Sequence, residues 1–135
     1  MNLWTVDERF EAVPKSFESP LSLVLSDLQQ PVPVDLIIGY EPSDDLLWFS
    51  ERGELGGSGF RTPPVGVAPT LEEVVYLAFW LQEQVFWETE GAWAEPRPQC
   101  PGHPHPMTPL EISGTAWWTC PVDKRAVVSV GSFRA

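Results

Sequence analysis

The two cysteines and the two histidines of this 135-residue chain all lie between Cys100 and Cys120. Thiolate and imidazole groups are the side chains that zinc prefers as ligands. Because all four of these side chains lie in one short stretch, we expect the stretch to fold so that they meet at a single point. This feature constrains the last third of the chain more than any other.

The same stretch is rich in proline, which removes backbone donors and prevents a regular helix. Six prolines fall between positions 96 and 109: Pro96, Pro98, Pro101, Pro104, Pro106 and Pro109. Beyond them, "GTAWWTC" (114–120) and "RAVVSVGSF" (125–133) predict two strands, joined by "PVDK" as a hairpin. We therefore expect residues 93–135 to form a proline-rich linker and a small β module packed on the rest of the chain. A module of about forty residues has a small hydrophobic core, so a bound metal would help it fold.

Two short motifs place the candidate ligands. "CPGH" (100–103) and "CPVD" (120–123) each begin with Cys-Pro and carry a possible ligand three residues later. The arrangement over residues 98–133 resembles a zinc ribbon, in which two such turns face each other across a β-hairpin. The resemblance implies a structural zinc ion held by Cys100, His103 and Cys120. Asp123 stands where the family has its fourth ligand, and His105 is its rival for that position.

Several alternatives to this zinc site stay open at the level of sequence. One alternative is a site lost in evolution, with the ribbon shape retained by Trp117, Trp118 and the prolines. Another is a disulfide between Cys100 and Cys120, which a reducing cytosol disfavours. His103 and His105 would face the same side of an extended segment but diverge in a polyproline helix. A catalytic zinc on Cys100, His103 and Cys120, with a water and Asp123 as base, would make a small hydrolase or transferase.

The first two thirds of the chain contain one clear helix, over residues 70–89. Thr70 and Glu73 form a capping box, and Gly91 can end the helix. We expect one broad apolar face to cover a sheet: Leu71, Val74, Val75, Ala78, Leu81, Val85 and Phe86. A second stripe of Tyr76, Trp80 and Trp87 needs cover of its own. It is expected to pack against the C-terminal module or, alternatively, to bind a partner or a second copy.

Shorter elements complete the expected body, residues 1–92. "VDLIIGY" (34–40) and "LLWFS" (46–50) predict two antiparallel strands, and "RGELGGSGF" (52–60) reads as a glycine-rich connection. "SPLSLVLSDLQQPVP" predicts a short helix that Ser19 caps, with Pro20 at its first position. The expected fold class is therefore α+β, a small antiparallel sheet packed on one long helix, followed by a zinc-ribbon-like β-hairpin module.

The charge of the chain is uneven. Its net charge is −11, and residues 1–90 hold 16 Asp and Glu against four Lys and Arg, whereas residues 91–135 hold three against four. Such an acidic field repels phosphate backbones and can steer a basic protein partner. A long apolar run and a basic leader are both missing from the sequence, so we expect a cytoplasmic protein that does not enter a membrane.

No catalytic constellation stands out, so the leading expectation is a non-catalytic protein-binding module of the inhibitor, immunity-factor or accessory-subunit type. Trp117 and Trp118 are adjacent and face opposite sides of a strand, so one of them enters the core. The other is either exposed to solvent or an anchor in an interface. We count Trp118 with Tyr76, Trp80 and Trp87 as partner-binding candidates. A third possibility is a ribbon-type nucleic-acid accessory protein using Lys124, Arg125 and Arg134.

Overall fold

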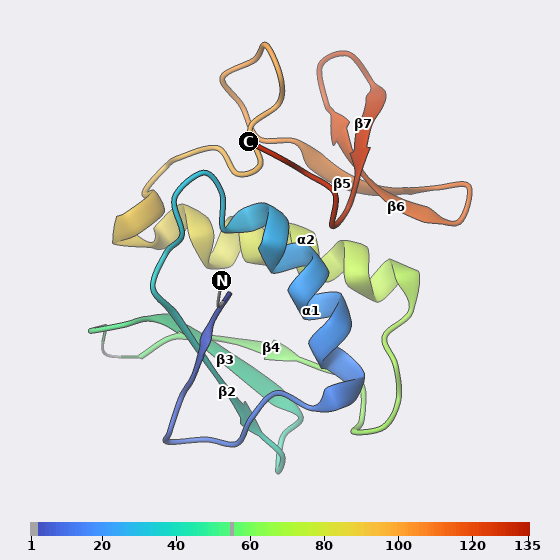
Figure 1. Ribbon diagram of the computed structural model, residues 1–135. Coiled ribbons are helices and arrows are strands. Elements are labelled where there is room, and N and C mark those ends of the chain that lie inside the picture. Colours follow the sequence, from blue (N-terminus) through green and yellow to red (C-terminus); the bar gives the residue numbers. More distant parts are fainter. Residues whose placement is uncertain (1–2, 55) are drawn as a thin grey trace.

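The protein has three layers, two sheets with a pair of helices between them (Figure 1). The computed structural model describes residues 3–54 and 56–135. The first sheet has the order β1 (Thr5–Val6), β2 (Leu36–Glu41), β3 (Leu46–Glu51) and β4 (Ser58–Arg61), and the second has the order β5 (Thr108–Ile112), β6 (Thr115–Cys120) and β7 (Arg125–Ser129). Helices α1 (Lys15–Leu28) and α2 (Leu71–Gln84) form the middle layer. The α+β prediction is confirmed.

The first sheet contains more than the predicted hairpin. β2 and β3 pair antiparallel as expected, whereas β1 pairs parallel to β2 and β4 comes from the glycine-rich stretch predicted to be a connection. Gly59 in β4 lies opposite Trp48, whose ring would stand 3.2 Å from a Cβ at that position. The glycine is therefore a strand residue that leaves room for an indole ring, which its composition alone does not reveal.

Helix α1 begins earlier than the sequence predicts. Its first residue is Lys15, with Pro20 inside the helix, so the expected start at Ser19 and Pro20 was wrong. Phe17 in the first turn is buried and its ring packs 6.1 Å from that of Phe60. Burial of such a ring stabilises the protein by more than the one hydrogen bond that Pro20 removes, so the helix extends back to include it.

Helix α2 has the predicted capping box, in which the Thr70 hydroxyl accepts from the Glu73 amide and the Glu73 carboxylate accepts from the Thr70 amide. The helix ends at Gln84, and the turns Phe86–Glu88 and Glu90–Ala92 are 3-10. Trp80 packs on the rings of Phe49 and Phe60 in the first sheet, with centroid distances of 5.5 and 5.2 Å. Tyr76 also lies against Phe60, with centroids 5.8 Å apart, so for Tyr76 and Trp80 the prediction that the C-terminal module covers the stripe was wrong. In the described part of the chain, no helix is long and apolar enough to cross a membrane.

The second sheet is tied to α1 through one buried carboxylate. Asp27 accepts hydrogen bonds from the Trp118 indole at 2.6 Å and from the amides of Gly131 and Phe133 at 2.6 and 3.1 Å. Trp118 is fully buried, so it is not available to a partner, contrary to its prediction as a binding residue. Burial raises the pKa of the Asp27 carboxyl, and the three donors oppose that rise.

Gly131 marks the closest approach of the C-terminal segment to α1. Its φ is +99°, and a Cβ at this position would lie 2.7 Å from Cδ2 of Leu23. The backbone conformation therefore favours glycine here, and a larger residue would also displace the end of the Leu23 side chain.

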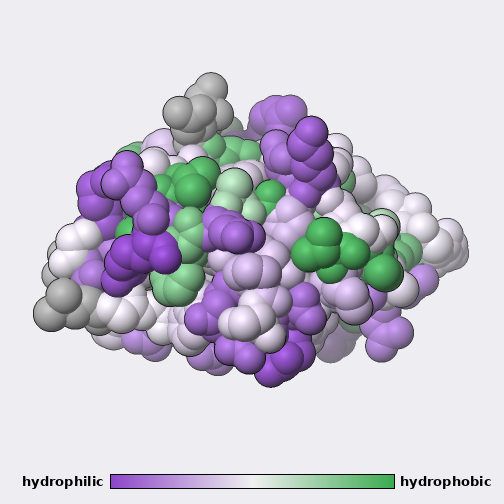
Figure 2. All heavy atoms as spheres, turned by 90° about the horizontal axis from the view of Figure 1, so that it is seen from below, coloured by the Kyte–Doolittle hydropathy of each residue, from purple (hydrophilic) through white to green (hydrophobic). Residues whose placement is uncertain are grey.

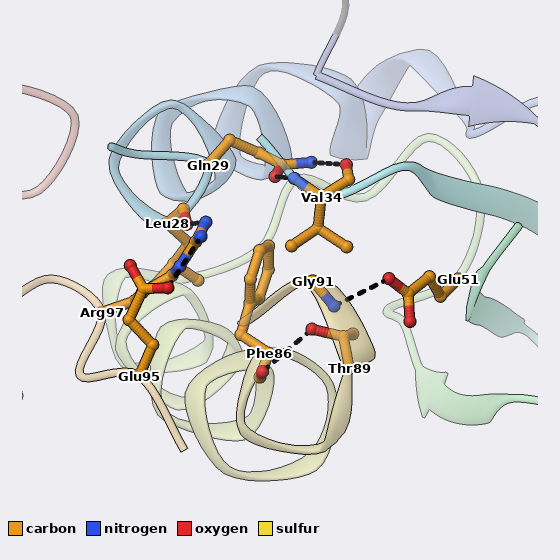
Figure 3. Close-up of polar contacts among 9 residues, drawn as sticks. All are labelled: Leu28, Gln29, Val34, Glu51, Phe86, Thr89, Gly91, Glu95 and Arg97. Atoms are coloured by element: carbon orange, nitrogen blue, oxygen red, sulfur yellow. Dashed lines mark hydrogen bonds and ion pairs between the residues drawn. The ribbon is translucent and has the colours of Figure 1, made fainter. Parts of the chain in front are cut away.

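The linker is held at the C-terminal end of α1 by a second set of polar contacts (Figure 3). Gln29 exchanges two hydrogen bonds with the backbone of Val34, and the buried Arg97 donates to the Leu28 carbonyl, the last residue of α1, at 3.0 Å. The guanidinium also lies 5.9 Å from the centre of the Phe86 ring. Arg97 thus joins the proline-rich segment to both helices.

We expect Arg97→Ala to lower the free energy of unfolding by about 2–4 kcal/mol, because it opens a cavity and leaves the Leu28 carbonyl without its donor. Urea unfolding followed by tryptophan fluorescence measures the change. Arg61→Ala is the matched control, since Arg61 also donates to a backbone carbonyl, that of Asp44, but at the surface. Equal losses in the two variants would contradict the role given to Arg97.

Candidate metal centre

The first Cys-Pro turn lies in a small hairpin made of the proline-rich segment. Met107 donates its amide to the Pro98 carbonyl at 2.8 Å, and Cys100 donates its amide to the His105 carbonyl at 2.9 Å. Inside this frame the His103 amide donates to the Cys100 carbonyl at 3.1 Å, with Gly102 at φ +78° in the turn. The hairpin therefore sets Cys100 and His105 opposite each other, and the tight turn returns His103 toward them.

The second Cys-Pro turn joins β6 to β7. Cys120 ends β6, its carbonyl accepts from the Lys124 amide at 2.8 Å, and its Sγ accepts from the Asp123 amide at 3.3 Å. Lys124 has φ +57°, a region that glycine or asparagine occupies at less cost. An amide donated to a cysteine sulfur stabilises the thiolate form, which is the form that binds metals. Figure 1 shows the two turns next to each other at the end of the molecule remote from the first sheet.

Four donor atoms, one each from Cys100, His103, His105 and Cys120, lie within 4.8 Å of one another. Zn–S bonds are about 2.3 Å and Zn–N bonds about 2.0 Å, so tetrahedral zinc ligands stand roughly 3.3–3.8 Å apart. The four residues are thus close enough to bind a metal ion after a small contraction. Both cysteines are buried free thiols, which removes the disulfide alternative.

The two histidines present their rings to the same side of the hairpin, as an extended segment predicts. The rings stack with centroids 5.0 Å apart and planes inclined by 27°. His105 Nδ1 lies 3.0 Å from the Pro106 carbonyl, which can only accept, so Nδ1 carries the proton. His105 Nε2 is buried and has no hydrogen-bond partner in the part of the chain that the structure describes. Such a lone pair is costly unless an ion or a donor meets it.

Asp123 takes a different place from the one that the zinc-ribbon resemblance implies. Its carboxylate lies 3.3 Å from His103 Nε2 and 3.5 Å from Arg125 Nε, outside the group of four donors. The bond with His103 lowers the pKa of Asp123 below its usual range, and Arg125 adds to the effect. Asp123 is therefore placed to orient a ligand histidine, the arrangement that commonly surrounds metal-bound imidazoles.

Burial raises the pKa of the Cys100 thiol to about 11, and the neighbouring Cys120 adds to the rise. Two buried sulfurs side by side cannot both ionise without a compensating positive charge. A divalent cation supplies that charge and displaces the protons. The pair of thiols thus matches the requirement of a metal site rather than that of a reactive nucleophile, which needs a lowered pKa.

The aromatic residues predicted to bind a partner are spread over different surroundings. Tyr76 is 57% exposed and Trp87 is 42% exposed, whereas Trp80 contacts the first sheet. Trp118 was predicted to bind a partner, yet Trp117 is the member of the pair on the outer face of β6, opposite Leu110. Strand alternation predicts that the two tryptophans face opposite sides, but it does not say which one faces α1.

Comparison of the chain with protein-family models, with curated proteins and with solved structures found no match.

Proposed function

We propose that the protein is a non-catalytic protein-binding module whose C-terminal sheet is stabilised by a structural zinc ion. The observation that carries this proposal is the cluster of four donors from Cys100, His103, His105 and Cys120, all within 4.8 Å. Two sulfurs and two imidazoles are a donor set typical of structural zinc. The thiols require a reducing compartment, which favours the cytoplasm.

The hydrogen bonds around the histidines support one mode of coordination. His103 uses Nε2 toward Asp123, which leaves Nδ1 for the ion, whereas His105 uses Nδ1 toward Pro106, which leaves the buried Nε2. Each imidazole thus has one nitrogen for the metal and one for an acceptor, as metal-bound histidines usually do.

A zinc ion held by all four donors keeps no position for a water molecule. Catalytic zinc requires such an open position, with a base near the bound water. Asp123, which lies beside the cluster, already accepts from His103. These points count against the small zinc-dependent hydrolase or transferase that the sequence also allowed.

Metal analysis by native mass spectrometry, on protein purified without a histidine tag, tests the proposal. We expect one zinc ion per chain, and we expect Cys100→Ser and His105→Ala to abolish tight binding. Cobalt substitution should produce the intense visible bands of a tetrahedral site, and two-bond nitrogen–proton correlation spectra should assign Nδ1 of His103 and Nε2 of His105 as ligands. If neither the native nor the refolded protein contained stoichiometric metal, the zinc part of the proposal would be refuted.

The protein-binding part of the proposal is tested by a separate experiment. A capture experiment from native lysate that returns no stoichiometric partner, with a monomer by light scattering, would count heavily against it. The predicted preference for a basic partner rests on the 16 acidic residues against four basic ones in residues 1–90.

We expect Asp123→Asn to retain zinc but to bind it about 10–100-fold more weakly, because the amide orients the His103 ring less firmly than a carboxylate does. Competition with a coloured chelator measures the affinity. Asp35→Asn, which changes an exposed acid paired with Arg52, should leave zinc affinity unchanged. Complete loss of zinc in Asp123→Asn would instead make Asp123 a direct ligand.

A further inference from the structure

The outer face of the β5–β7 sheet carries apolar side chains that nothing in the described chain covers. On β5, Leu110 is 50% and Ile112 is 40% exposed, and the two residues lie two apart on one face of the strand, with Glu111 between them on the other face. The half-buried Trp117 stands opposite Leu110 on the same face. A solvent-facing strand normally places polar residues at these positions, so an apolar row of this kind is typical of a binding surface.

The turn from β6 to β7 encloses this face on one side and makes a groove of about 250 Å³. Its lining includes Leu110, Ile112, Cys120, Pro121, Lys124 and Arg125. The apolar wall comes from β5 and the basic rim from the turn. Because Cys120 is one of the four metal donors, the ion that fixes the turn also fixes the shape of the groove.

Lys124 is an unexpected residue for its position. Its φ of +57° is a conformation in which glycine costs less, and the first Cys-Pro turn uses Gly102 in that region. Within residues 3–54 and 56–135, the structure gives Lys124 no ion pair, whereas Arg125 has Asp123. Lys124 therefore combines a costly backbone conformation with a charge that no ion pair takes up, at the rim of a groove.

The first sheet has a groove of about 210 Å³ lined by Arg9, Phe10 and Trp48, but the charge of Arg9 is taken up by Asp7 at 2.8 Å. Seen from below, where the β1–β4 sheet lies, apolar atoms form separate groups divided by hydrophilic residues (Figure 2). Val65 and Val67, in the connection to α2, are exposed but belong to no groove among the cavities of the described residues.

We propose that the groove binds an extended segment of a partner protein that carries an apolar side chain next to acidic side chains. The proposal rests on the protein-binding part of the proposed function and names the surface and the chemistry of the segment that it binds. The acidic field of residues 1–90 favours a basic partner as a whole, whereas the groove lies in residues 91–135, where four Lys and Arg stand against three Asp and Glu, so the segment seated in it is the acidic part of that partner. Charge complementarity decides the partner class, since the rim holds Lys124 and Arg125 and the groove lining holds no acidic residue. Recognition goes through side chains rather than strand addition, because Pro109 has no amide to offer at the edge of β5.

A display library of random peptides, selected on the zinc-loaded protein, provides the probe. We expect the selected sequences to be enriched in Asp and Glu beside Leu, Ile or Phe. Enrichment of Lys and Arg, or no enrichment above a blank surface, would overturn the proposal. The most enriched peptide is then synthesised with a fluorescent label, and its dissociation constant is measured by anisotropy.

Variants of exposed residues test the surface without disturbing the fold. We expect Leu110→Glu to weaken peptide binding about 10-fold or more, because it places an acid on the apolar wall. Val65→Glu, an equal change at a remote exposed valine, should leave binding within about twofold. Peptide binding to Leu110→Glu that equals the wild type would contradict the assignment of the groove.

Lys124→Gly separates binding from stability. It relieves the positive φ, so the variant should be at least as stable as the wild type while it binds the acidic peptide several-fold more weakly and with less dependence on salt. Ser113→Gly is the matched control, since Ser113 has φ +51° in the turn between β5 and β6 and does not line the groove. It should change stability in the same direction and leave the peptide affinity as it is.

The oligomeric state and the zinc content of each preparation distinguish the competing outcomes. Sedimentation that shows a dimer, lost in Leu110→Glu, would assign the groove to a second copy and overturn the peptide proposal. The zinc content of every preparation is measured. Protein that contains zinc but does not bind the peptide would refute this inference and leave the zinc part of the proposed function intact. Peptide binding in protein that holds no metal refutes only the zinc part of the proposed function.

Discussion

Replacing Asp27 with alanine lowers the free energy of unfolding by about 3–5 kcal/mol, the largest effect that we expect from a single substitution outside the metal centre. The change removes the acceptor of three hydrogen bonds, from the Trp118 indole and from the amides of Gly131 and Phe133. Each of these donors lies in or beside the core, where a missing partner costs more than in water. Urea unfolding monitored by tryptophan fluorescence measures the loss.

Two comparisons make this result interpretable. Asp27→Asn keeps one carbonyl oxygen and presents an amide to the remaining donor, so its loss should fall between those of the wild type and the alanine variant. Asp35→Ala removes an acid that is 60% exposed and paired with Arg52 at 2.8 Å, and should cost less than about 1 kcal/mol. An Asp27→Ala protein as stable as the Asp35→Ala protein would show that the second sheet does not depend on this carboxylate.

Removing zinc with a strong chelator is expected to lower the free energy of unfolding by about 4 kcal/mol, the value that mass action gives when free zinc had stood at a thousand times its dissociation constant. In the proposed zinc-bound form the ion joins the two turns that carry the four donors, so its removal releases both. Hydrogen exchange should show where order is lost. The amides of Cys100 and Met107 should exchange faster without zinc, while that of Ile38 in the first sheet stays protected.

The chelation result has a specific control. Cys100→Ser protein, which starts without zinc, should show the low stability from the outset and should not respond to the chelator. A wild-type protein whose unfolding midpoint stays the same after its zinc has been stripped would mean that packing around the buried Trp118 alone holds the second sheet.

Local patterns were sufficient to predict several elements. Thr70 and Glu73 mark the start of helix α2 within one turn, so the helix could be predicted from them. The β2–β3 hairpin could be predicted from the two apolar runs on either side of "EPSDD". The β6–β7 hairpin and the convergence of Cys100 and Cys120 followed from two Cys-Pro turns of equal spacing. In each case the signal lies within a few residues of the structure that it specifies.

Contacts between distant segments decided the rest. The face of α2 that bears Trp80 had two possible neighbours, and only packing against Phe49 and Phe60 selects the first sheet. The choice between His105 and Asp123 as the fourth donor likewise depends on the backbone bond from Cys100 to His105 across the small hairpin. The positions of His105 and Asp123 in the sequence leave both residues within reach of the site. Sequence spacing does not determine which part of the proline-rich segment folds back toward Cys100.

The contact of Gly131 with Leu23 joins positions that are far apart in the chain, and the positive φ of Gly131 disfavours any other residue there. Sequences descended from a common ancestor with this chain should keep glycine at position 131, and those that carry a larger residue there should carry a shorter side chain at position 23. Such covariation would reveal the docking of the second sheet on α1 without any coordinates.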